Sequence, residues 1–363
     1  MNDIFNFSAG PAMLPREVLD QIDAELKNWH NLNVSVMEIS HRSDEFHEIV
    51  YNSEHDLREL LNIPNVYKVL FCHGGARTQF SSVPMNLLGG FHVTDYINSG
   101  YWSRSAAQEA EKYCKVNLIN VSILDENHVC SVKNMKDWPL SSNSAYLHYC
   151  PNETIDGVAI HEQPEFNDSV VVVGDFSSTL LSAPINVNCF GMIYAAAQKN
   201  IGLPGLTIVI IREDLLNREC HQVPSTLQYS ILNNYKSMFN TPPTFSWYVA
   251  GLIFKWIKRH GGLIAMSLRN IEKANLLYEA IDSSDYYYNN IAQMNRSYMN
   301  VPFYLHDEKL NDIFLQESNY VGLYALKGHR SVGGMRASLY NSMPLQGVEM
   351  LVEFMEWFAK KYG

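Results

Sequence analysis

The sequence predicts an α/β protein, with a large domain built on a mostly parallel sheet and a small α+β domain after it. Its 363 residues are enough for about two domains at roughly 150 residues each. Short apolar segments that read as strands alternate with segments of helical periodicity along the first two thirds of the chain. The strand segments are apolar at successive positions, which is typical of parallel strands covered by helices on both faces.

The first predicted elements are helices and strands of the large domain. Val18, Ile22 and Leu26 follow Pro15 at helical spacing, and a similar pattern runs over 46–61. A strand over 68–72 leads through a glycine-rich turn at 73–77 into a helix over 78–88. Residues 95–98 read as another strand end and 103–112 as another helix. The backbone N–H groups at a strand–turn–helix junction can bind an anion, so the turn is a candidate binding element.

Polar residues follow the next predicted strands, which span 145–149, 169–174 and 192–197. Thr154, Asp175 and Lys199 come at or shortly after their ends. A further strand over 206–212 fits an antiparallel neighbour. Because ligands bind beyond the carboxyl ends of the strands in such sheets, we expect the three side chains to face one site.

The C-terminal part predicts a second, smaller domain. Helices over 247–260 and 266–281 are separated by a glycine pair, and the remainder combines a strand over 300–305 with helices over 311–318 and 345–361. We therefore expect a large domain over 1–265, with an N-terminal arm over 1–15, and a small domain over 266–363.

Composition excludes several function classes. Against 38 Asp and Glu there are 27 Lys and Arg, a formal net charge of −11, which disfavours a nucleic-acid partner. The six cysteines form no CxxC pair and the histidines no HExxH motif, so we expect free thiols and no metal site. The sequence shows neither a signal peptide nor a membrane-spanning run, which predicts a cytoplasmic protein with no membrane partner.

The polar strand ends are typical of pyridoxal 5′-phosphate (PLP) chemistry. A desolvated lysine such as Lys199 has a lowered pKa and can attack a carbonyl, and Asp175 can keep a pyridine nitrogen protonated. The turn at 73–77 would bind the phosphate. Each position also fits a plainer role: Lys199 as a surface lysine, Asp175 as a helix N-cap, and 73–77 as an ordinary turn.

Eight motifs resemble those of the phosphoserine aminotransferase family, which belongs to the class V, fold-type-I PLP enzymes. The matching segments run in family order at 7–15, 37–42, 71–77, 148–157, 175–178, 198–202, 239–244 and 327–337. The resemblance covers nearly the whole chain, and it implies a seven-stranded sheet in the large domain.

The resemblance implies a cofactor role for each matching position. Lys199 would carry PLP as a Schiff base, and Asp175 would bond the pyridine nitrogen. Trp102 would stack on the cofactor ring, although it also fits a core aromatic, and Thr154 would bond the phenolic oxygen. The phosphate would be held by Ala76, Arg77 and Gln198, and by Asn240 and Thr241 of a second copy in a homodimer with shared active sites.

The resemblance also implies the substrate contacts. Arg336 would bind the α-carboxylate through its planar fork of donors. Arg42 and Arg77, with His41 and His329, would bind the distal phosphate or carboxylate. Arg42 also fits a surface charge at a helix start, and the two histidines fit structural roles.

The implied activity is a ping-pong amino transfer between L-glutamate and 3-phosphohydroxypyruvate, which gives O-phospho-L-serine and 2-oxoglutarate. The products belong to serine biosynthesis, and a related activity on 3-hydroxy-2-oxo-4-phosphonooxybutanoate would serve pyridoxine biosynthesis. The alternatives are a cysteine desulfurase, an alanine–glyoxylate aminotransferase or a cofactor-free binding protein. A desulfurase is disfavoured because no cysteine follows Cys220.

Overall fold

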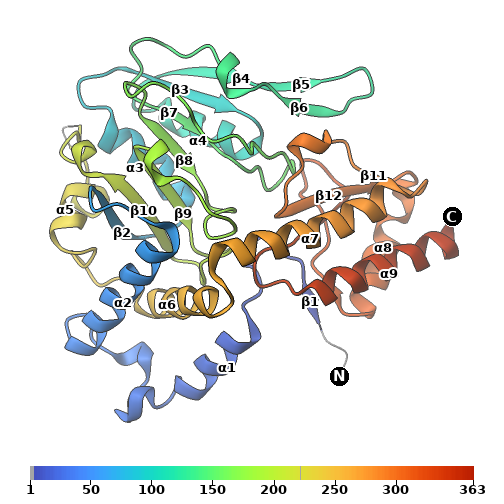
Figure 1. Ribbon diagram of the computed structural model, residues 1–363, viewed down its shortest axis with the longest axis horizontal. Helices are drawn as coiled ribbons and strands as arrows, with labels where there is room; N and C mark the ends of the chain where they lie inside the picture. The colour runs from blue at the N-terminus through green and yellow to red at the C-terminus, as the bar shows by residue number, and fades with distance from the viewer. Residues whose placement is uncertain (1–3, 221) are drawn as a thin grey trace.

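A twisted seven-stranded sheet forms the centre of the computed structural model, which describes residues 4–220 and 222–363 (Figure 1). In spatial order its strands are β2 (Tyr67–His73), β10 (Leu206–Arg212), β9 (Met192–Ala196), β8 (Val172–Asp175), β7 (Leu147–Tyr149), β3 (Val93–Asn98) and β4 (Lys115–Asn120). Strand β10 is antiparallel to β2 and β9, and the other pairs are parallel. The predicted fold class and the antiparallel strand are confirmed.

Helices cover both faces of this sheet. Along β2, Val69 and Phe71 belong to one hydrophobic cluster, whereas Leu70 and Cys72 belong to another, because successive side chains point to opposite faces. Helices α3 and α4 pack in the second cluster, and α2 and α6 in the first. The helices are α1 (Arg16–Glu25), α2 (Asp44–Leu61), α3 (Ala76–Leu87), α4 (Tyr101–Ala110), α5 (Tyr229–Asn234), α6 (Thr244–Arg259), α7 (Gly262–Asp282), α8 (Asn311–Tyr320) and α9 (Leu345–Tyr362).

A second core lies around α8 and α9. It includes the antiparallel sheet of β11 (Tyr287–Tyr288), β12 (Asn300–Leu305) and β14 (Met335–Ser338). The pair β1 (Phe5–Asn6) and β13 (Leu323–Tyr324) is parallel, and Phe5 and Phe7 are buried in this same core. The chain start therefore packs with the second core, although the arm over 1–15 was expected with the large domain; residues 1–3 of that arm lie outside the described residues.

Helix α7 is shared by the two cores. Leu263 and Met266 pack in the first core, whereas Ala274 and Leu277 pack in the second. The proposed division at residue 265 falls inside this helix, which belongs to both cores. The boundary between the two domains therefore stays a prediction. A remaining hairpin of β5 (Ser122–Leu124) and β6 (Cys130–Val132) projects beside β4 (Figure 1).

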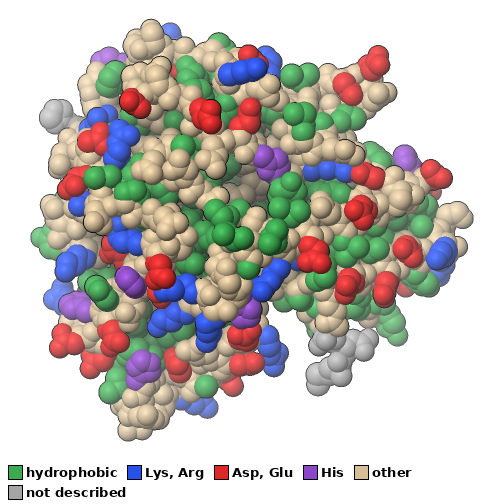
Figure 2. Space-filling model, viewed as in Figure 1, with side chains coloured by type: hydrophobic (Ala, Val, Ile, Leu, Met, Phe, Trp, Pro, Cys, Tyr) green, Lys and Arg blue, Asp and Glu red, His purple; other side chains and the backbone are tan. Residues whose placement is uncertain are grey.

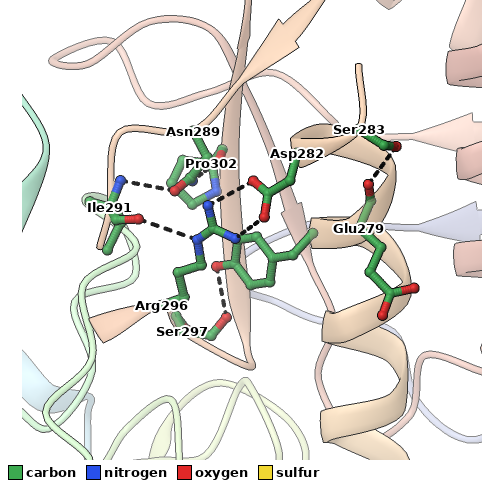
Figure 3. A network of polar contacts seen from close by, with 9 residues as sticks. Glu279, Asp282, Ser283, Asn289, Ile291, Arg296, Ser297 and Pro302 are labelled. Carbon is green, nitrogen blue, oxygen red and sulfur yellow. Dashed lines mark hydrogen bonds and ion pairs between the residues drawn. The ribbon is translucent and has the colours of Figure 1, made fainter. Parts of the chain in front are cut away.

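A network around Arg296 fastens the end of α7 to the loop before β12 (Figure 3). The Arg296 guanidinium bonds both Asp282 oxygens at 2.6 and 2.8 Å and lies 4.6 Å from the Tyr278 ring centroid. The Tyr278 hydroxyl donates to the Ser297 carbonyl at 3.0 Å. Arg296 also forms a β-bridge with Val158, so the network supports the segment that follows Thr154.

Charges are unevenly distributed over the surface. On the face shown in Figure 2, Lys and Arg side chains gather near α6, whose last turn carries Lys258 and Arg259. The net charge of −11 therefore does not prevent local regions of positive charge. Within residues 4–220 and 222–363, no helix combines the length and apolar character needed to cross a membrane.

Candidate active site

A cavity of about 300 Å³ lies at the carboxyl ends of β7, β8 and β9. These strands are parallel, so the residues that follow them meet at one edge of the sheet. The lining residues are Gly75, Ala76, Arg77, Trp102, Cys150, Asn152, Asp175, Ser177, Ser178, Ala196, Gln198 and Lys199. The structure thus brings the predicted lysine, aspartate, tryptophan and glycine-rich turn together in one cavity.

Lys199 lies three residues after the end of β9 and lines the cavity. Burial lowers the pKa of its amine to about 8, although the nearby Asp175 charge acts in the opposite direction. The neutral amine is therefore far more populated at neutral pH than in a lysine with the ordinary pKa of 10.5. A neutral amine can act as a nucleophile or as a base, whereas an ammonium cannot.

Asp175 is the last residue of β8 and is 6% exposed. Its Oδ1 accepts bonds from the Ser177 amide at 2.9 Å and the Ser177 hydroxyl at 2.5 Å. The Tyr194 hydroxyl contacts both Asp175 and, at 2.9 Å, His148 Nε2. Burial raises the pKa of Asp175, and the Ser177 bonds oppose that shift. The Asp175 carboxylate is thus held in a fixed position in the cavity wall.

The N-terminus of α3 faces the cavity with free donors. Gly75 precedes the helix, and space above it is open where a Cβ would stand. Among residues 4–220 and 222–363, the amides of Ala76 and Arg77 donate no hydrogen bond. Unpaired amides at the positive end of a helix dipole suit an anion such as a phosphate.

Trp102 forms one wall of the cavity and is held by Thr154. Its Nε1 donates to the Thr154 hydroxyl oxygen at 2.7 Å, and the Arg77 guanidinium lies 5.2 Å from the ring centroid. Arg336 Nη1 donates to the Thr154 carbonyl at 3.2 Å. Arg336 Nε is buried and has no partner within the described part of the chain. Thr154 therefore lies behind the Trp102 wall of the cavity, and Arg336 lies next to Thr154.

Comparison with known proteins identifies the family. The model described as "Aminotransferase class-V" matches residues 4–351, nearly the whole chain. The chain belongs to the class V aminotransferase family. The seven-stranded sheet and the lysine at a strand end agree with the expectations that the sequence motifs raised.

Individual class V aminotransferases are similar over their full length. The curated "Phosphoserine aminotransferase" of Blochmanniella floridana is 57% identical over 366 residues, which is 100% of both chains. The phosphoserine aminotransferase structure from Bacillus circulans subsp. alkalophilus is 40% identical, with a TM-score of 0.95 and 99% of each chain covered. The PLP-bound phosphoserine aminotransferase from Trichomonas vaginalis is 40% identical, with a TM-score of 0.92, and covers 97% of this chain and 99% of its own.

Several site residues predicted for this aminotransferase lie away from the cavity. His41 and Arg42 precede α2, and Asn240 and Thr241 precede α6; none of them lines the cavity, and all but the half-buried His41 are exposed. His329 bonds Ser331 at 2.6 Å and lies near Arg336, whose charge, after burial, contributes to lowering the pKa of His329. A single chain therefore does not bring these residues into the cavity.

Supporting residues that the sequence analysis did not identify surround the cavity. Ser177 and Tyr194 hold Asp175, and Glu153 and Asp156 bind the N-terminus of α4 next to Trp102. One sequence signal could have indicated the last pair: α4 begins after Gly100, which has no side chain to cap the helix. Its free amides require acceptors from elsewhere in the chain.

Proposed function

We propose that this aminotransferase uses PLP attached at Lys199 and transfers an amino group between L-glutamate and 3-phosphohydroxypyruvate. The products would be O-phospho-L-serine and 2-oxoglutarate, formed in a ping-pong sequence. The observation that carries the proposal is the convergence of an amine, a carboxylate and unpaired helix amides in one cavity. Full-length relatives named phosphoserine aminotransferase support this choice of substrates.

The donor set of the cavity fits PLP. The amides of α3, with Gln198 and Arg77, would hold the phosphate, Asp175 would face the pyridine nitrogen, and Trp102 would stack on the ring. The Thr154 hydroxyl accepts a bond from Trp102, which leaves its own proton free to donate to the phenolic oxygen. When bound, PLP supplies an electron sink for the electron pair of the substrate Cα–H bond.

Lys199 would perform the proton transfer. Freed by the incoming amino group of the substrate, its Nζ would take the proton from Cα as a base and, as an acid, deliver it to the cofactor carbon that would bear the transferred nitrogen. Burial lowers the pKa of this amine to about 8, which is near the operating range of a general base at neutral pH. Asp175, fixed by Ser177, would place its negative charge at the pyridine nitrogen and keep that nitrogen protonated.

Arginine side chains would bind both substrates. Arg336 would bind the α-carboxylate, because its buried Nε is free to donate and its planar fork matches a carboxylate. Arg42 and Arg77, with His41 and His329, would bind the distal group. These donors accept either a carboxylate or a phosphate, as a single pocket for glutamate and a phosphorylated oxo acid requires.

A homodimer would complete the site. Asn240 and Thr241 lie exposed in one chain, which fits contacts to the cofactor phosphate of a partner. The six cysteines are free thiols, which supports the expected reducing, cytoplasmic setting. A related activity on 3-hydroxy-2-oxo-4-phosphonooxybutanoate, in pyridoxine biosynthesis, is part of the same proposal.

A coupled assay with glutamate and 3-phosphohydroxypyruvate against a panel of other oxo acids tests the substrates. We expect a visible cofactor band that glutamate bleaches and 3-phosphohydroxypyruvate restores. Borohydride reduction followed by peptide mapping should find the label on Lys199. A preference for glyoxylate would instead favour the alanine–glyoxylate activity.

The desulfurase alternative needs a reactive cysteine. Cys150 lines the cavity, but burial raises the pKa of its thiol well above the usual range. A thiol that stays protonated is a poor nucleophile. We therefore retain the aminotransferase proposal alone.

A further inference from the structure

The N-terminus of α4 is bound by two carboxylates that lie more than 50 residues away in the sequence. Glu153 Oε2 accepts a bond from the Trp102 amide at 2.8 Å, and its Oε1 accepts one from the Ser103 amide at 2.8 Å. Asp156 Oδ2 accepts one from the Tyr101 amide at 3.0 Å. Each of the first three amides of α4 therefore has a carboxylate acceptor.

Glu153 is fully buried, with 0% of its surface exposed. Such a side chain is costly to place in a protein interior unless donors satisfy it. Burial raises its pKa to about 7, whereas the bonds from Ser103 and Trp102 act in the opposite direction. The positive end of the α4 dipole stabilises the ionised form as well. The buried Glu153 carboxylate thus accepts bonds from two amides of one helix, and its Oε1 also accepts one from the Ser99 hydroxyl at 3.5 Å.

The backbone at Gly100 is adapted to this contact. A Cβ at residue 100 would lie 2.6 Å from Glu153 Cγ and 2.6 Å from Asp156 Oδ2. Any side chain there would displace both carboxylates from the helix. The glycine is therefore explained by the close approach of Glu153 and Asp156 rather than by a tight turn.

The same segment holds Trp102 at two points. Glu153 binds its backbone amide, and the next residue, Thr154, binds its indole Nε1 at 2.7 Å. Together the two contacts fix the start of the side chain and the far edge of the ring. Trp102 forms a wall of the cavity that also contains Lys199 and Asp175.

We propose that Glu153 is a positioning residue, whose carboxylate fixes the Trp102 backbone and thereby the plane of the indole that stacks on the cofactor. The proposal rests on the function proposed above, because it needs a planar ring in the cavity. Glu153 itself contacts the α4 amides rather than the cavity, so it acts through Trp102.

The test compares Glu153→Gln with Asp156→Asn in the full-length protein. A glutamine has one acceptor oxygen, so its NH₂ group would face one of the two amides. In Asp156→Asn, the amide oxygen can still accept the single bond from the Tyr101 amide that Asp156 accepts in the wild type. We expect Glu153→Gln to weaken PLP binding about 10-fold, and Asp156→Asn less than about threefold. The dissociation constant for PLP, measured by visible absorbance titration, is the readout.

A double-mutant cycle shows whether the effect passes through Trp102. In a Trp102→Leu background, Glu153→Gln should change the PLP dissociation constant less than about twofold. A full 10-fold loss in that background, or no loss in the wild-type background, would overturn the proposal. Should Glu153→Gln not fold, Gly100→Ala, which displaces both Glu153 and Asp156, is judged by the same two criteria, and Asp156→Asn gives the share of its effect that is due to Asp156. A wild-type protein that binds no PLP would instead refute the proposed function.

Discussion

Two groups of predicted site residues differ in where the single chain places them. One group, the cavity set, comprises Ala76, Arg77, Trp102, Asp175, Gln198 and Lys199, which line one cavity. The other, the remote set, comprises His41, Arg42, Asn240 and Thr241, which lie before α2 and α6 and outside that cavity. The difference fits the proposal that one chain would hold the cofactor ring by its own strand ends. In that proposal, the exposed Asn240 and Thr241 would contribute to the site of a second copy.

Substitution of Lys199 should give the largest effect, because it removes the reacting amine from the cavity set. We expect Lys199→Ala to reduce turnover by about 10⁴-fold, the upper range for loss of a general base. The protein should still bind PLP noncovalently, since the other members of the cavity set are unchanged. Steady-state assays and visible spectra check both points, and turnover near the wild-type rate would refute the assignment.

Arg336 lies next to the cavity set through Thr154, so its loss should be the next largest. We expect Arg336→Ala to slow both half-reactions by about 10³-fold, because the α-carboxylate of every substrate would lose a buried charge partner. Single-turnover measurements with glutamate and with 3-phosphohydroxypyruvate provide the check. A loss confined to the phosphorylated substrate would place Arg336 at the distal end of the pocket instead.

The pH dependence of stability should distinguish a buried amine from an exposed one. The Lys199 amine has a folded-state pKa of about 8 against an ordinary value of 10.5. Between these values the unfolded chain holds a proton that the folded chain lacks, so stability rises with pH. Relative to Lys199→Met, the cofactor-free wild type should gain about 3 kcal/mol of unfolding free energy from pH 7 to 10.5.

Urea unfolding at several pH values measures this gain. Lys360→Met is the matched control, because its ammonium is exposed in the wild type and should give no such change. An equal pH dependence for the two variants would show that Lys199 is not desolvated.

In the proposed homodimer, Asn240 and Thr241 of the remote set should act on the site of the partner subunit. Their substitution should have the smallest effect on the reaction. We expect Asn240→Ala combined with Thr241→Ala to weaken PLP binding about 10-fold, since two phosphate contacts are lost. At a PLP concentration that loads the wild type but little of this variant, mixing it with Lys199→Ala subunits and allowing exchange should raise activity to about a quarter of the wild-type value, because half of the dimers then contain one intact site. No recovery after demonstrated exchange would place Asn240 and Thr241 outside the shared site.

Two members of the cavity set were accessible from strand ends alone, whereas Ala76, Trp102 and Gln198 came from the resemblance to the family. Asp175 and Lys199 follow apolar runs, and the rule that ligands bind beyond strand ends needs no further information. The support around them was not accessible. Tyr194 meets His148 across 46 residues, and Glu153 meets Trp102 across 51, contacts that only the folded sheet creates.

Edge elements were harder to predict than central ones. Strand β4 was missed because polar residues interrupt its apolar ones, as expected for a strand at the edge of the sheet. The strands β1, β11 and β13 are only two residues long, too short for a periodic pattern. The predicted helices agree with the structure to within a few residues at most of their ends.

The pairing of β1 with β13 has a consequence for how the chain folds during synthesis. Phe5 pairs with Leu323, so this contact can form only after the 318 residues that follow Phe5 have been synthesised. Contacts of such long sequence separation form slowly and late. The C-terminal core would stay incomplete until β1 pairs with β13 and Phe5 and Phe7 pack into it. A fragment that begins at residue 266 would lack Phe5 and Phe7, and it should aggregate rather than fold alone.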